Sequence, residues 1–275
     1  MSPEDPPIAV DVAVVNWNTA GAALAAASAY CASEGVETRV TIVDNDSRPE
    51  QRDLLREGCP EGVRLDLSEE NLGYGRAANR ALRGGSGKLV CISNADVVPE
   101  PSALAALAEA ARAEAPWAGM VGPVFGGDAD RYHAALPNGA TMLARIFAGS
   151  FGERPQPSPP AGAVSEVGQP SGACFVVDRD LWERVGGFDE GFFLWYEDVD
   201  LAKRLHDAGL RNLVAGSARV GHAGAEAFAQ IDRRRQQAIR LASVERYIRL
   251  HHRWAIPFAA PLLRLSRRLR AGGAR

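Results

Sequence analysis

The sequence predicts an α/β protein with a mainly parallel sheet covered by helices on both faces. Strand-like apolar runs alternate with helix-like segments through the N-terminal half of the 275-residue chain, and this alternation is typical of parallel sheets. Polar residues also follow three of the predicted strands: Asn16-Trp17-Asn18, Asp44-Asn45-Asp46 and Asn94-Ala95-Asp96. Because such sheets bind ligands at the carboxyl ends of their strands, these clusters predict one shared site.

The N-terminal half supplies most of the predicted sheet. Short Val- and Ile-rich runs indicate buried strands, at Ile8 to Asn16, Thr38 to Val43, Val63 to Leu67 and Lys88 to Ser93. The segments between and after them predict helices at Ala20 to Ala32, Pro49 to Glu57, Asn71 to Leu82 and Pro101 to Ala113. Proline is favoured in the first turn of a helix, as at Pro101.

Regular patterning stops at Gly126 and returns at about Pro170. A loop of that length is usually functional or disordered. Beyond it we expect a strand at Gly172 to Val177, helices at Arg179 to Val185 and Glu197 to Ala208, an extended segment at Leu213 to Val220, and a long Arg-rich helix at Ala227 to Leu250.

Composition favours a globular cytoplasmic protein, with 46% hydrophobic and 24% charged residues. The four cysteines, Cys31, Cys59, Cys91 and Cys174, are widely spaced, which argues against a zinc site or disulfide framework. The acidic, Pro-rich N-terminus does not resemble a signal peptide. No run approaches the roughly 20 apolar residues that a membrane helix needs.

The net charge of −3 is unevenly distributed, because Ile231 to Arg275 holds twelve arginines against two acidic residues. Within this segment, Leu262 to Arg270 is amphipathic enough to lie on an anionic bilayer. We therefore weigh peripheral contact with the inner face of a membrane against a solvated or homodimer-forming helix. Nucleic-acid binding is not expected, because the basic residues come without a recognisable motif.

Asp96 is a candidate ligand for a divalent cation. It lies in a polar turn after a predicted buried strand, and Mg²⁺ at phosphate sites takes only one or two protein carboxylates. Such an ion would neutralise charge on a leaving diphosphate. A helix cap is the alternative, but Pro99 and Pro101 place the next helix start too late for it.

Glu197, Asp198 and His222 are further candidates. The aromatic run Phe192 to Tyr196 precedes the two acids and would raise a carboxylate pKa by desolvation, as a general base needs. Acids in a first helical turn are also often only dipole partners. Asp200 falls on another helical face from Asp198. His222 favours a structural role, although imidazole is a normal ligand for Mn²⁺.

The segment Gly73-x-Gly75-x-x-Ala78 matches a dinucleotide-binding fingerprint, with Asp96 about 20 residues further on. That fingerprint belongs in the first strand-to-helix turn, whereas this copy follows the third predicted strand. An NAD-type oxidoreductase is therefore the weaker interpretation. The glycines would instead let the backbone approach a diphosphate, with Arg76 nearby as a cation.

Six motifs in order resemble glycosyltransferase family two, with its GT-A fold, and particularly the rhamnosyltransferase-like branch. They are VAVVNWN (Val12 to Asn18), VDNDS (Val43 to Ser47), NLGYGRAAN (Asn71 to Asn79), SNADV (Ser93 to Val97), the segment from Ser171 to Leu205, and VGHAG (Val220 to Gly224). The resemblance implies a catalytic domain at 1–225, with a nucleotide-binding half at about 8–125 and an acceptor half at 126–225. A basic helical extension at 226–275 would follow.

The resemblance also implies roles for individual residues in an inverting transferase that uses Mn²⁺ or Mg²⁺ and a UDP- or dTDP-linked sugar. Asp198 would be the base, with Glu197 beside it, and Asp96 and His222 would hold the metal. Because Asn94 replaces the first acid of the usual D-x-D motif, the metal would rest more on His222. The donor would contact Asn16, Trp17, Asn18, Asp44, Asp46, Gly73, Gly75, Arg76, Asn79, Asn94 and Asp96.

The acceptor is not identified by the sequence, and a glycan, a lipid-linked sugar and a small molecule all stay open. The stretch 126–170 is the expected place for its selection. A non-catalytic sugar-nucleotide-binding module is the other alternative, since a fold alone does not imply activity.

Overall fold

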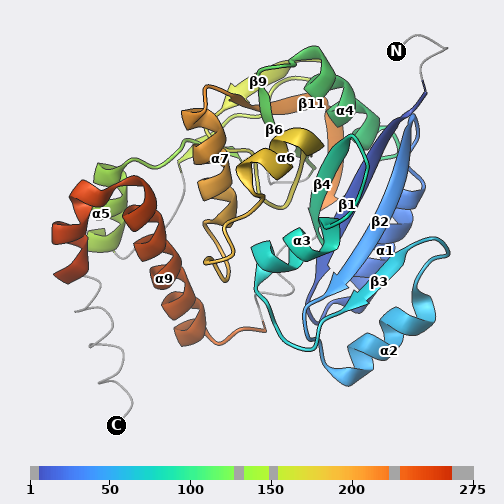
Figure 1. Ribbon diagram of the computed structural model, residues 1–275, viewed down its shortest axis with the longest axis horizontal. Helices are drawn as coiled ribbons and strands as arrows, with labels where there is room; N and C mark the ends of the chain where they lie inside the picture. Colours follow the sequence, from blue (N-terminus) through green and yellow to red (C-terminus); the bar gives the residue numbers. More distant parts are fainter. Residues whose placement is uncertain (1–5, 127–132, 149–153, 223–229, 262–275) are drawn as a thin grey trace.

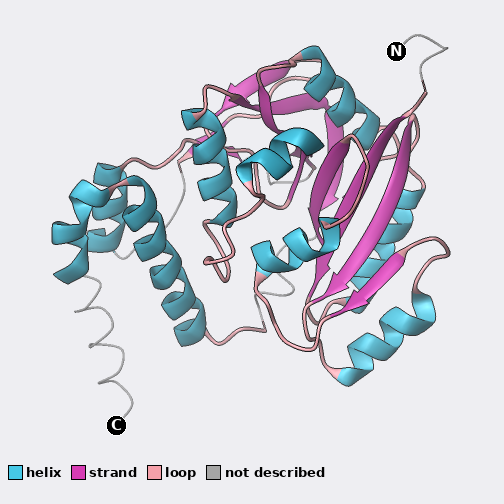
Figure 2. Ribbon diagram, viewed as in Figure 1, coloured by secondary structure: helices cyan, strands magenta, loops and turns pink. Residues whose placement is uncertain are grey.

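The structure, a computed structural model, describes residues 6–126, 133–148, 154–222 and 230–261. Within these residues one mixed, mostly parallel sheet of nine strands forms the centre, in the order β3-β2-β1-β4-β10-β6-β11-β5, with β9 paired to β11 outside this path. Helices lie on both faces of the sheet (Figures 1 and 2). The expected α/β class is confirmed.

The parallel half of the sheet brings the polar clusters together. It consists of β1 (Ile8–Asn16), β2 (Val36–Asp44), β3 (Arg64–Leu67) and β4 (Leu89–Asn94). In register, Asn16 lies opposite Asp44, and Val15 lies opposite Asn94. The three strands that precede the clusters therefore end at one edge of the sheet.

The other half combines predicted and unpredicted strands. The predicted strand at Gly172 to Val177 and the extended segment at Leu213 to Val220 correspond to β10 (Cys174–Asp178) and β11 (Arg211–His222). The strands β5 (Val97–Pro99), β6 (Ala118–Phe125) and β9 (Val164–Val167) were not predicted, and β7 (His133–Ala134) and β8 (Pro155–Gln156) form a separate pair. Strand β6 was missed because its glycines and proline indicate a loop. A Cβ at Gly122 would lie 2.7 Å from Pro170 Cβ, so close packing requires glycine there.

Two hydrophobic clusters fasten the helices to opposite faces of the sheet. One face is covered by α1 (Ala20–Cys31), α2 (Pro49–Gly58) and α4 (Ala103–Ala113). The other is covered by α3 (Tyr74–Leu82), α6 (Arg179–Val185) and α7 (Glu197–Asp207). Val12 and Ala13 of β1 belong to different clusters, as alternate residues of a strand must.

A third cluster joins the C-terminal helix to the segment before α7. Helices α5 (Gly139–Ala148) and α9 (Arg233–His251), with the short η1 (Arg253–Ala255), bury Met142, Val244 and Tyr247 against Phe192 and Tyr196. Figure 1 shows α5 and α9 beside the central sheet and its covering helices. The first turn of α9 lies toward the carboxyl ends of β1 and β2. Helix α5 occupies part of the stretch that was expected to be a loop.

Several predicted boundaries were wrong by a few residues. Helix α9 does not begin at Ala227, because Asp232 accepts hydrogen bonds from the backbone N–H groups of Arg234 and Arg235 and caps the helix at Arg233. The predicted tail at 262–275 lies outside the described residues. In the described part of the chain, no helix is both long and apolar enough to cross a membrane.

Candidate active site

A pocket lies at the carboxyl edge of the parallel strands and encloses about 830 Å³, part of it open to solvent. Its walls come from the ends of β1 and β4, the turn before α3, the aromatic segment before α7 and the start of α9. The lining residues are Val15, Trp17, Thr19, Asn45, Asn71, Gly73, Tyr74, Asn94, Ala95, Asp96, Phe193, Leu194, Ile231, Arg235 and Ile239.

Asp96 and His222 meet at this pocket. Strand β5 pairs antiparallel with the end of β11, which places His222 opposite Val97. The His222 Nε2 atom lies 3.2 Å from Asp96 Oδ1. Asp96 is followed by β5, and α4 has Ser102 at its N-cap; the helix-cap interpretation of Asp96 is therefore excluded.

This pair suits a divalent cation whose shell is completed by its ligand. An oxygen and a nitrogen donor are within reach of one ion, and the described residues contain no cluster of three or more His, Cys, Asp and Glu side chains that would enclose a metal. Sites for Mg²⁺ at phosphates are typically of this sparse kind, because phosphate oxygens and water supply the other ligands.

Glu197 and Asp198 begin helix α7 directly after two residues in the left-handed region, Trp195 (φ 65°) and Tyr196 (φ 72°). Such non-glycine conformations cost free energy and gather at functional sites. The tight turn delivers both carboxylates toward the sheet edge. Phe192 and Tyr196 are buried beneath it, so the predicted aromatic surrounding is present.

Burial raises the pKa of both carboxyl groups. Desolvation, followed by the charge of Asp198, raises the pKa of Glu197 to about 8. Glu197 is 5% exposed, and within the described residues its buried Oε2 has no hydrogen-bond partner. Asp198 also has a raised pKa because of burial, but its Oδ2 accepts a 2.8 Å hydrogen bond from Gln169 Nε2. The Asp198 carboxylate therefore has a side-chain hydrogen-bond donor, whereas the buried Oε2 of Glu197 has none among the described residues.

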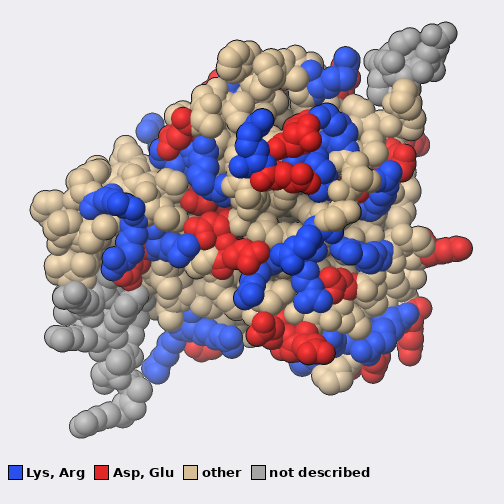
Figure 3. Space-filling model, in the orientation of Figure 1, with Lys and Arg blue, Asp and Glu red and all other residues tan. Residues whose placement is uncertain are grey.

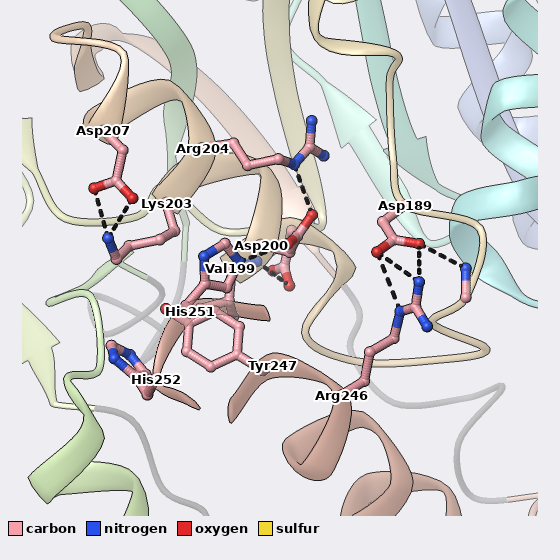
Figure 4. Close-up of polar contacts among 12 residues, drawn as sticks. Asp189, Val199, Asp200, Lys203, Arg204, Asp207, Arg246, Tyr247, His251 and His252 are labelled. Carbon is pink, nitrogen blue, oxygen red and sulfur yellow. Dashed lines mark hydrogen bonds and ion pairs between the residues drawn. The ribbon is translucent and has the colours of Figure 1, made fainter. Parts of the chain in front are cut away.

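Asp200 faces away from Asp198 and braces the helix, as the sequence predicted for different helical faces. It is 1% exposed. Its Oδ2 accepts a 2.8 Å hydrogen bond from Arg204 Nε, and its Oδ1 lies 2.7 Å from His251 Nε2. Figure 4 shows this contact between α7 and α9 beside a second one, from Arg246 to Asp189.

Tyr74 lies near Asp96 of the N-terminal half and near Glu197 and Asp198 of the C-terminal half, and it was not among the residues predicted from the sequence. It lines the pocket, and its hydroxyl donates to the Gly172 carbonyl oxygen at 3.3 Å. Burial raises the pKa of Tyr74 well above its ordinary value, and the charges of Glu197, Asp198 and Asp96 raise it further. All three carboxylates are therefore close enough to Tyr74 for their charges to act on it. Its place in the NLGYGRAAN motif was the available signal.

The glycines of that motif let the chain approach itself. Gly73 has φ 84°, and a Cβ there would lie 2.9 Å from the Phe193 Cα. A Cβ at Gly75 would lie 3.0 Å from Phe188 Cβ and 3.4 Å from Glu197 Cβ. The turn before α3 is thus pressed against the segment that carries the candidate base, and Gly73 also lines the pocket.

Asn16 and Asp44 lie behind the pocket wall. Both are buried, and Asn16 Nδ2 donates to Asp44 Oδ1 at 2.8 Å. The Asn16 Oδ1 atom accepts from Thr19 Oγ1 at 2.9 Å. Neither belongs to the lining, whereas Trp17 and Asn94 do. The hydrogen bond between Asn16 and Asp44 holds the ends of β1 and β2 together.

Asn18 and Asp46 occupy the turns after these two strands, both in the left-handed region, with φ 56° and 62°. The Asn18 backbone N–H donates to Ser47 Oγ at 2.7 Å, and its carbonyl oxygen accepts from Gln230 Nε2 at 3.2 Å. Asp46 lies 4.0 Å from Arg52 Nη1. Neither residue lines the pocket.

Arg76 and Asn79 lie on α3 outside the pocket lining. Arg76 Nε lies 3.3 Å from Glu190 Oε2. Asn79 bonds both backbone groups of Phe188, donating to its carbonyl oxygen at 2.9 Å and accepting from its N–H at 3.0 Å. These contacts tie α3 to the turn that leads to the acids.

Three pocket residues come from the C-terminal helix region, which was expected to be a separate extension. Ile231, Arg235 and Ile239 all line the pocket. Arg235 and Ile239 are four residues apart on α9 and therefore lie on one side of the helix, whereas Ile231 precedes the N-cap Asp232; the spacing of four was the signal that the sequence offered. It was hidden among the surrounding arginines.

Comparison with known proteins identifies the same family that the sequence motifs indicate. Residues 6–255 match the family model described as "Glycosyltransferase like family 2". An N-acetylglucosaminyl-diphospho-decaprenol L-rhamnosyltransferase of Mycobacterium tuberculosis is 32% identical over 211 residues, 66% of this chain and 66% of the relative. The O-antigen biosynthesis protein RfbC of Myxococcus xanthus is 29% identical over 198 residues, 66% of this chain but 14% of the relative. These matches confirm the predicted resemblance.

Solved structures share the fold at low sequence identity. The mannosyltransferase PcManGT from Pyrobaculum calidifontis, in complex with GDP-Man and Mn²⁺, has a TM-score of 0.56 and 20% identity over 98% of this chain and 76% of its own. GalNAc-T7 with UDP, GalNAc and Mn²⁺ has a TM-score of 0.55 and 16% identity over 80% of this chain and 44% of its own. The likeness to these glycosyltransferases confirms the expected GT-A fold.

Proposed function

The chain belongs to glycosyltransferase-like family 2, and on that premise we propose that it transfers a sugar from a nucleoside-diphosphate sugar to an acceptor hydroxyl, with inversion at the anomeric carbon. One observation carries the proposal: Tyr74 lines the same pocket as Asp96, which contacts His222, and the Tyr74 hydroxyl donates to Gly172, which lies against the Asp198 carboxylate. A leaving-group side and a base side are therefore adjacent. Because the chain belongs to this family, the NAD-type interpretation of the glycine motif is not favoured.

Asp198 is the proposed base. Its carboxylate is oriented by Gln169 Nε2 on one oxygen and by the Val199 N–H, at 2.8 Å, on the other. Burial and the neighbouring charge of Asp198 raise the pKa of Glu197 to about 8, so Glu197 tends to keep its proton near neutral pH. This leaves Asp198, whose oxygens are both hydrogen-bonded, as the candidate to accept the acceptor proton.

The reaction then needs a single in-line displacement. The acceptor oxygen bonds to the anomeric carbon, the bond from that carbon to the diphosphate oxygen breaks, and the hydroxyl proton passes to Asp198. Asp96 and His222 would hold a divalent cation, Mn²⁺ or Mg²⁺, which supplies Lewis-acid stabilisation of the leaving diphosphate. Positioned proton transfer contributes roughly 10²–10⁴-fold to such a rate.

The donor is proposed to be UDP- or dTDP-linked, and the acceptor to be a lipid-linked sugar at the cytoplasmic face of a membrane. The name of the mycobacterial relatives, a diphospho-decaprenol rhamnosyltransferase, supports the lipid-linked class and a deoxyhexose. That alignment covers just under two thirds of the relatives. The Mn²⁺ complexes of the structural neighbours support the divalent cation.

An apolar surface near the end of α9 supports docking to an anionic bilayer. Trp254 and Phe258 are 59% and 60% exposed, and Arg249 and Arg253 lie in the same stretch of chain. Aromatic rings beside cations are typical of membrane-surface segments. Trp254→Ala with Phe258→Ala should reduce co-sedimentation with anionic vesicles, whereas Trp117→Ala, which removes a ring that is 58% exposed elsewhere, should not. Equal binding by both variants contradicts the docking proposal.

Thermal unfolding with UDP, dTDP, GDP, CDP and NAD, each with and without Mn²⁺ or Mg²⁺, tests the proposed function. Ligand at about 100 times its Kd adds roughly 2.7 kcal/mol of stability. We expect stabilisation by one nucleoside diphosphate, and only with metal. Stabilisation by NAD alone would refute the proposal. Donor binding without turnover on supplied lipid-linked acceptors would instead favour a non-catalytic sugar-nucleotide-binding module.

A further inference from the structure

The pocket that would bind the anionic donor has few charged residues in its lining. Among the described residues that line the pocket, Asp96 is the one acid and Arg235 the one cation. The divalent cation proposed at Asp96 and His222 would offset the charge of one carboxylate and part of the diphosphate, and a basic side chain in the wall would add to the attraction for the anionic donor. Arg76, the cation expected from the sequence, lies outside the lining beside Glu190.

The start of α9 is fastened across the pocket. Gln230 Nε2 donates to the Asn18 carbonyl oxygen at 3.2 Å, which ties the residue before Ile231 to the end of β1. Further along the helix, Ser243 Oγ donates to the Leu194 carbonyl oxygen at 2.8 Å. These two contacts hold α9 to the turn after β1 and to the segment before α7, both of which contribute residues to the pocket.

The charges in this first turn oppose the helix dipole. Arg233, Arg234 and Arg235 occupy it, and Asp232 at the N-cap is the one acid next to them. Cations at a helix N-terminus are unfavourable, whereas anions there are favoured. Figure 3 shows basic side chains at this lower end of α9. An anionic ligand would reverse the unfavourable arrangement.

Arg235 differs from its two neighbours in where it lies. It shares its side of the helix with Ile239, and both line the pocket together with Ile231, which precedes the helix, whereas Arg233 and Arg234 do not line it. In the described part of the chain its guanidinium makes no ion pair. A planar guanidinium binds phosphate oxygens with two parallel hydrogen bonds.

We propose that Arg235 binds the diphosphate of the nucleotide donor, so that the C-terminal helix completes the donor site. This inference rests on the proposed function and adds a residue to it. It also assigns a role to the segment that the sequence presented as a separate basic extension. Ile231 and Ile239 would then form the apolar border that excludes water from this contact.

The test compares Arg235→Ala, Arg235→Lys and the control Arg233→Ala, which removes the same charge from the same turn. Affinity for the nucleoside diphosphate with Mn²⁺ and for the matching nucleoside is measured by calorimetry. We expect Arg235→Ala to weaken the diphosphate by about 10- to 100-fold, as for the loss of a charge-assisted hydrogen bond. Nucleoside binding should be unchanged, and Arg233→Ala should behave as wild type. Arg235→Lys should fall between the two.

Melting of the ligand-free variants separates binding from folding. Arg235 is exposed, so Arg235→Ala should melt no lower than wild type. Equal diphosphate affinity in wild type and Arg235→Ala overturns the inference while the proposed function stands. A parallel loss of nucleoside binding also overturns it, because the defect would then concern the whole pocket. A wild-type protein that binds no nucleoside diphosphate refutes the proposed function, and the inference falls with it.

Discussion

The Nε2 atom of His222 lies 3.2 Å from Oδ1 of Asp96, and the antiparallel pairing of β5 with β11 sets that distance. Asp96 follows the parallel strand β4 of the N-terminal half, and His222 is the last residue of β11. The contact therefore depends on the completed sheet. A metal held by this pair would in turn link β5 to β11.

His222→Gln and Asp96→Asn should each weaken the metal-dependent part of nucleoside diphosphate binding by at least about 10-fold, since each removes a proposed donor to the ion. Asp53→Asn is the control, because Asp53 is an exposed acid on α2 that lies outside the pocket lining. Binding is followed by titration with and without Mn²⁺. Metal dependence that survives in both variants would place the ion elsewhere.

Asp198→Asn should reduce transfer by roughly 10²–10⁴-fold, because the amide cannot accept the acceptor proton. Donor affinity should stay near wild type, since the substitution keeps the shape of the side chain. Asp207→Asn is a matched control at the other end of α7, where Asp207 pairs with Lys203. Single-turnover rates and donor titrations are the measurements. A near-normal rate for Asp198→Asn would remove Asp198 as the base.

Glu197 should make the folded protein less stable as the pH rises. Its pKa is raised from an ordinary 4.5 to about 8 by burial and by Asp198. The folded state therefore holds the proton more tightly than the unfolded state, and this contribution is complete below about pH 4.5 and lost as the pH rises through about 8.

Denaturant unfolding of wild type and Glu197→Gln between those pH values measures this effect. The wild type should lose stability relative to the variant by at most about 1.4 kcal/mol for each pH unit. The Gln side chain carries no proton to lose, so its stability curve lacks this component. Parallel curves for the two proteins would show that folding does not raise the pKa of Glu197.

Gly73→Ala should destabilise the protein by roughly 1–3 kcal/mol and disturb the pocket, because it adds strain at a positive φ and a clash with the backbone of Phe193. Gly62→Ala separates the two effects. Gly62 has φ 79°, and nothing lies within 4 Å of its added Cβ, so it suffers the backbone strain alone. Equal losses of unfolding free energy in both variants would show that the approach to Phe193 has no cost.

The parts of the site that lie at parallel strand ends could be predicted from sequence. Apolar runs followed by Asn16, Asp44 and Asp96 place those residues at one edge, because parallel neighbours end together. Glu197 and Asp198 were also readable, since their aromatic neighbours adjoin them in the chain. In each case the information lies within about ten residues.

The remaining parts depend on contacts between distant segments. Strand β6 contains Gly122, whose small size serves packing against Pro170, yet glycine and proline in a strand indicate a loop to any local method. Arg235 reaches the pocket only because Val244 and Tyr247 bury α9 against Phe192 and Tyr196. No pattern within α9 identifies that partner.

His251→Ala should test whether α9 stabilises the helix of the candidate base. Asp200 is buried and lies between Arg204 and His251 (Figure 4), so removing the imidazole leaves a buried carboxylate oxygen without its partner. Such a loss costs about 1–3 kcal/mol. Denaturant unfolding measures it, with His206→Ala as the control, since His206 is an exposed histidine on α7 itself.

The same variant should also slow transfer more than it weakens donor binding, because Asp200 and Asp198 share the first turn of α7 and Asp198 acts on the acceptor. A loss of stability without any change in rate would mean that α9 holds the fold but not the base. Rates and stabilities equal to those of His206→Ala would mean that the contact between His251 and Asp200 does neither. The salt bridge from Arg246 to Asp189 and the hydrogen bond from Ser243 to the Leu194 carbonyl oxygen would then be the polar contacts that hold α9 to the turn before α7.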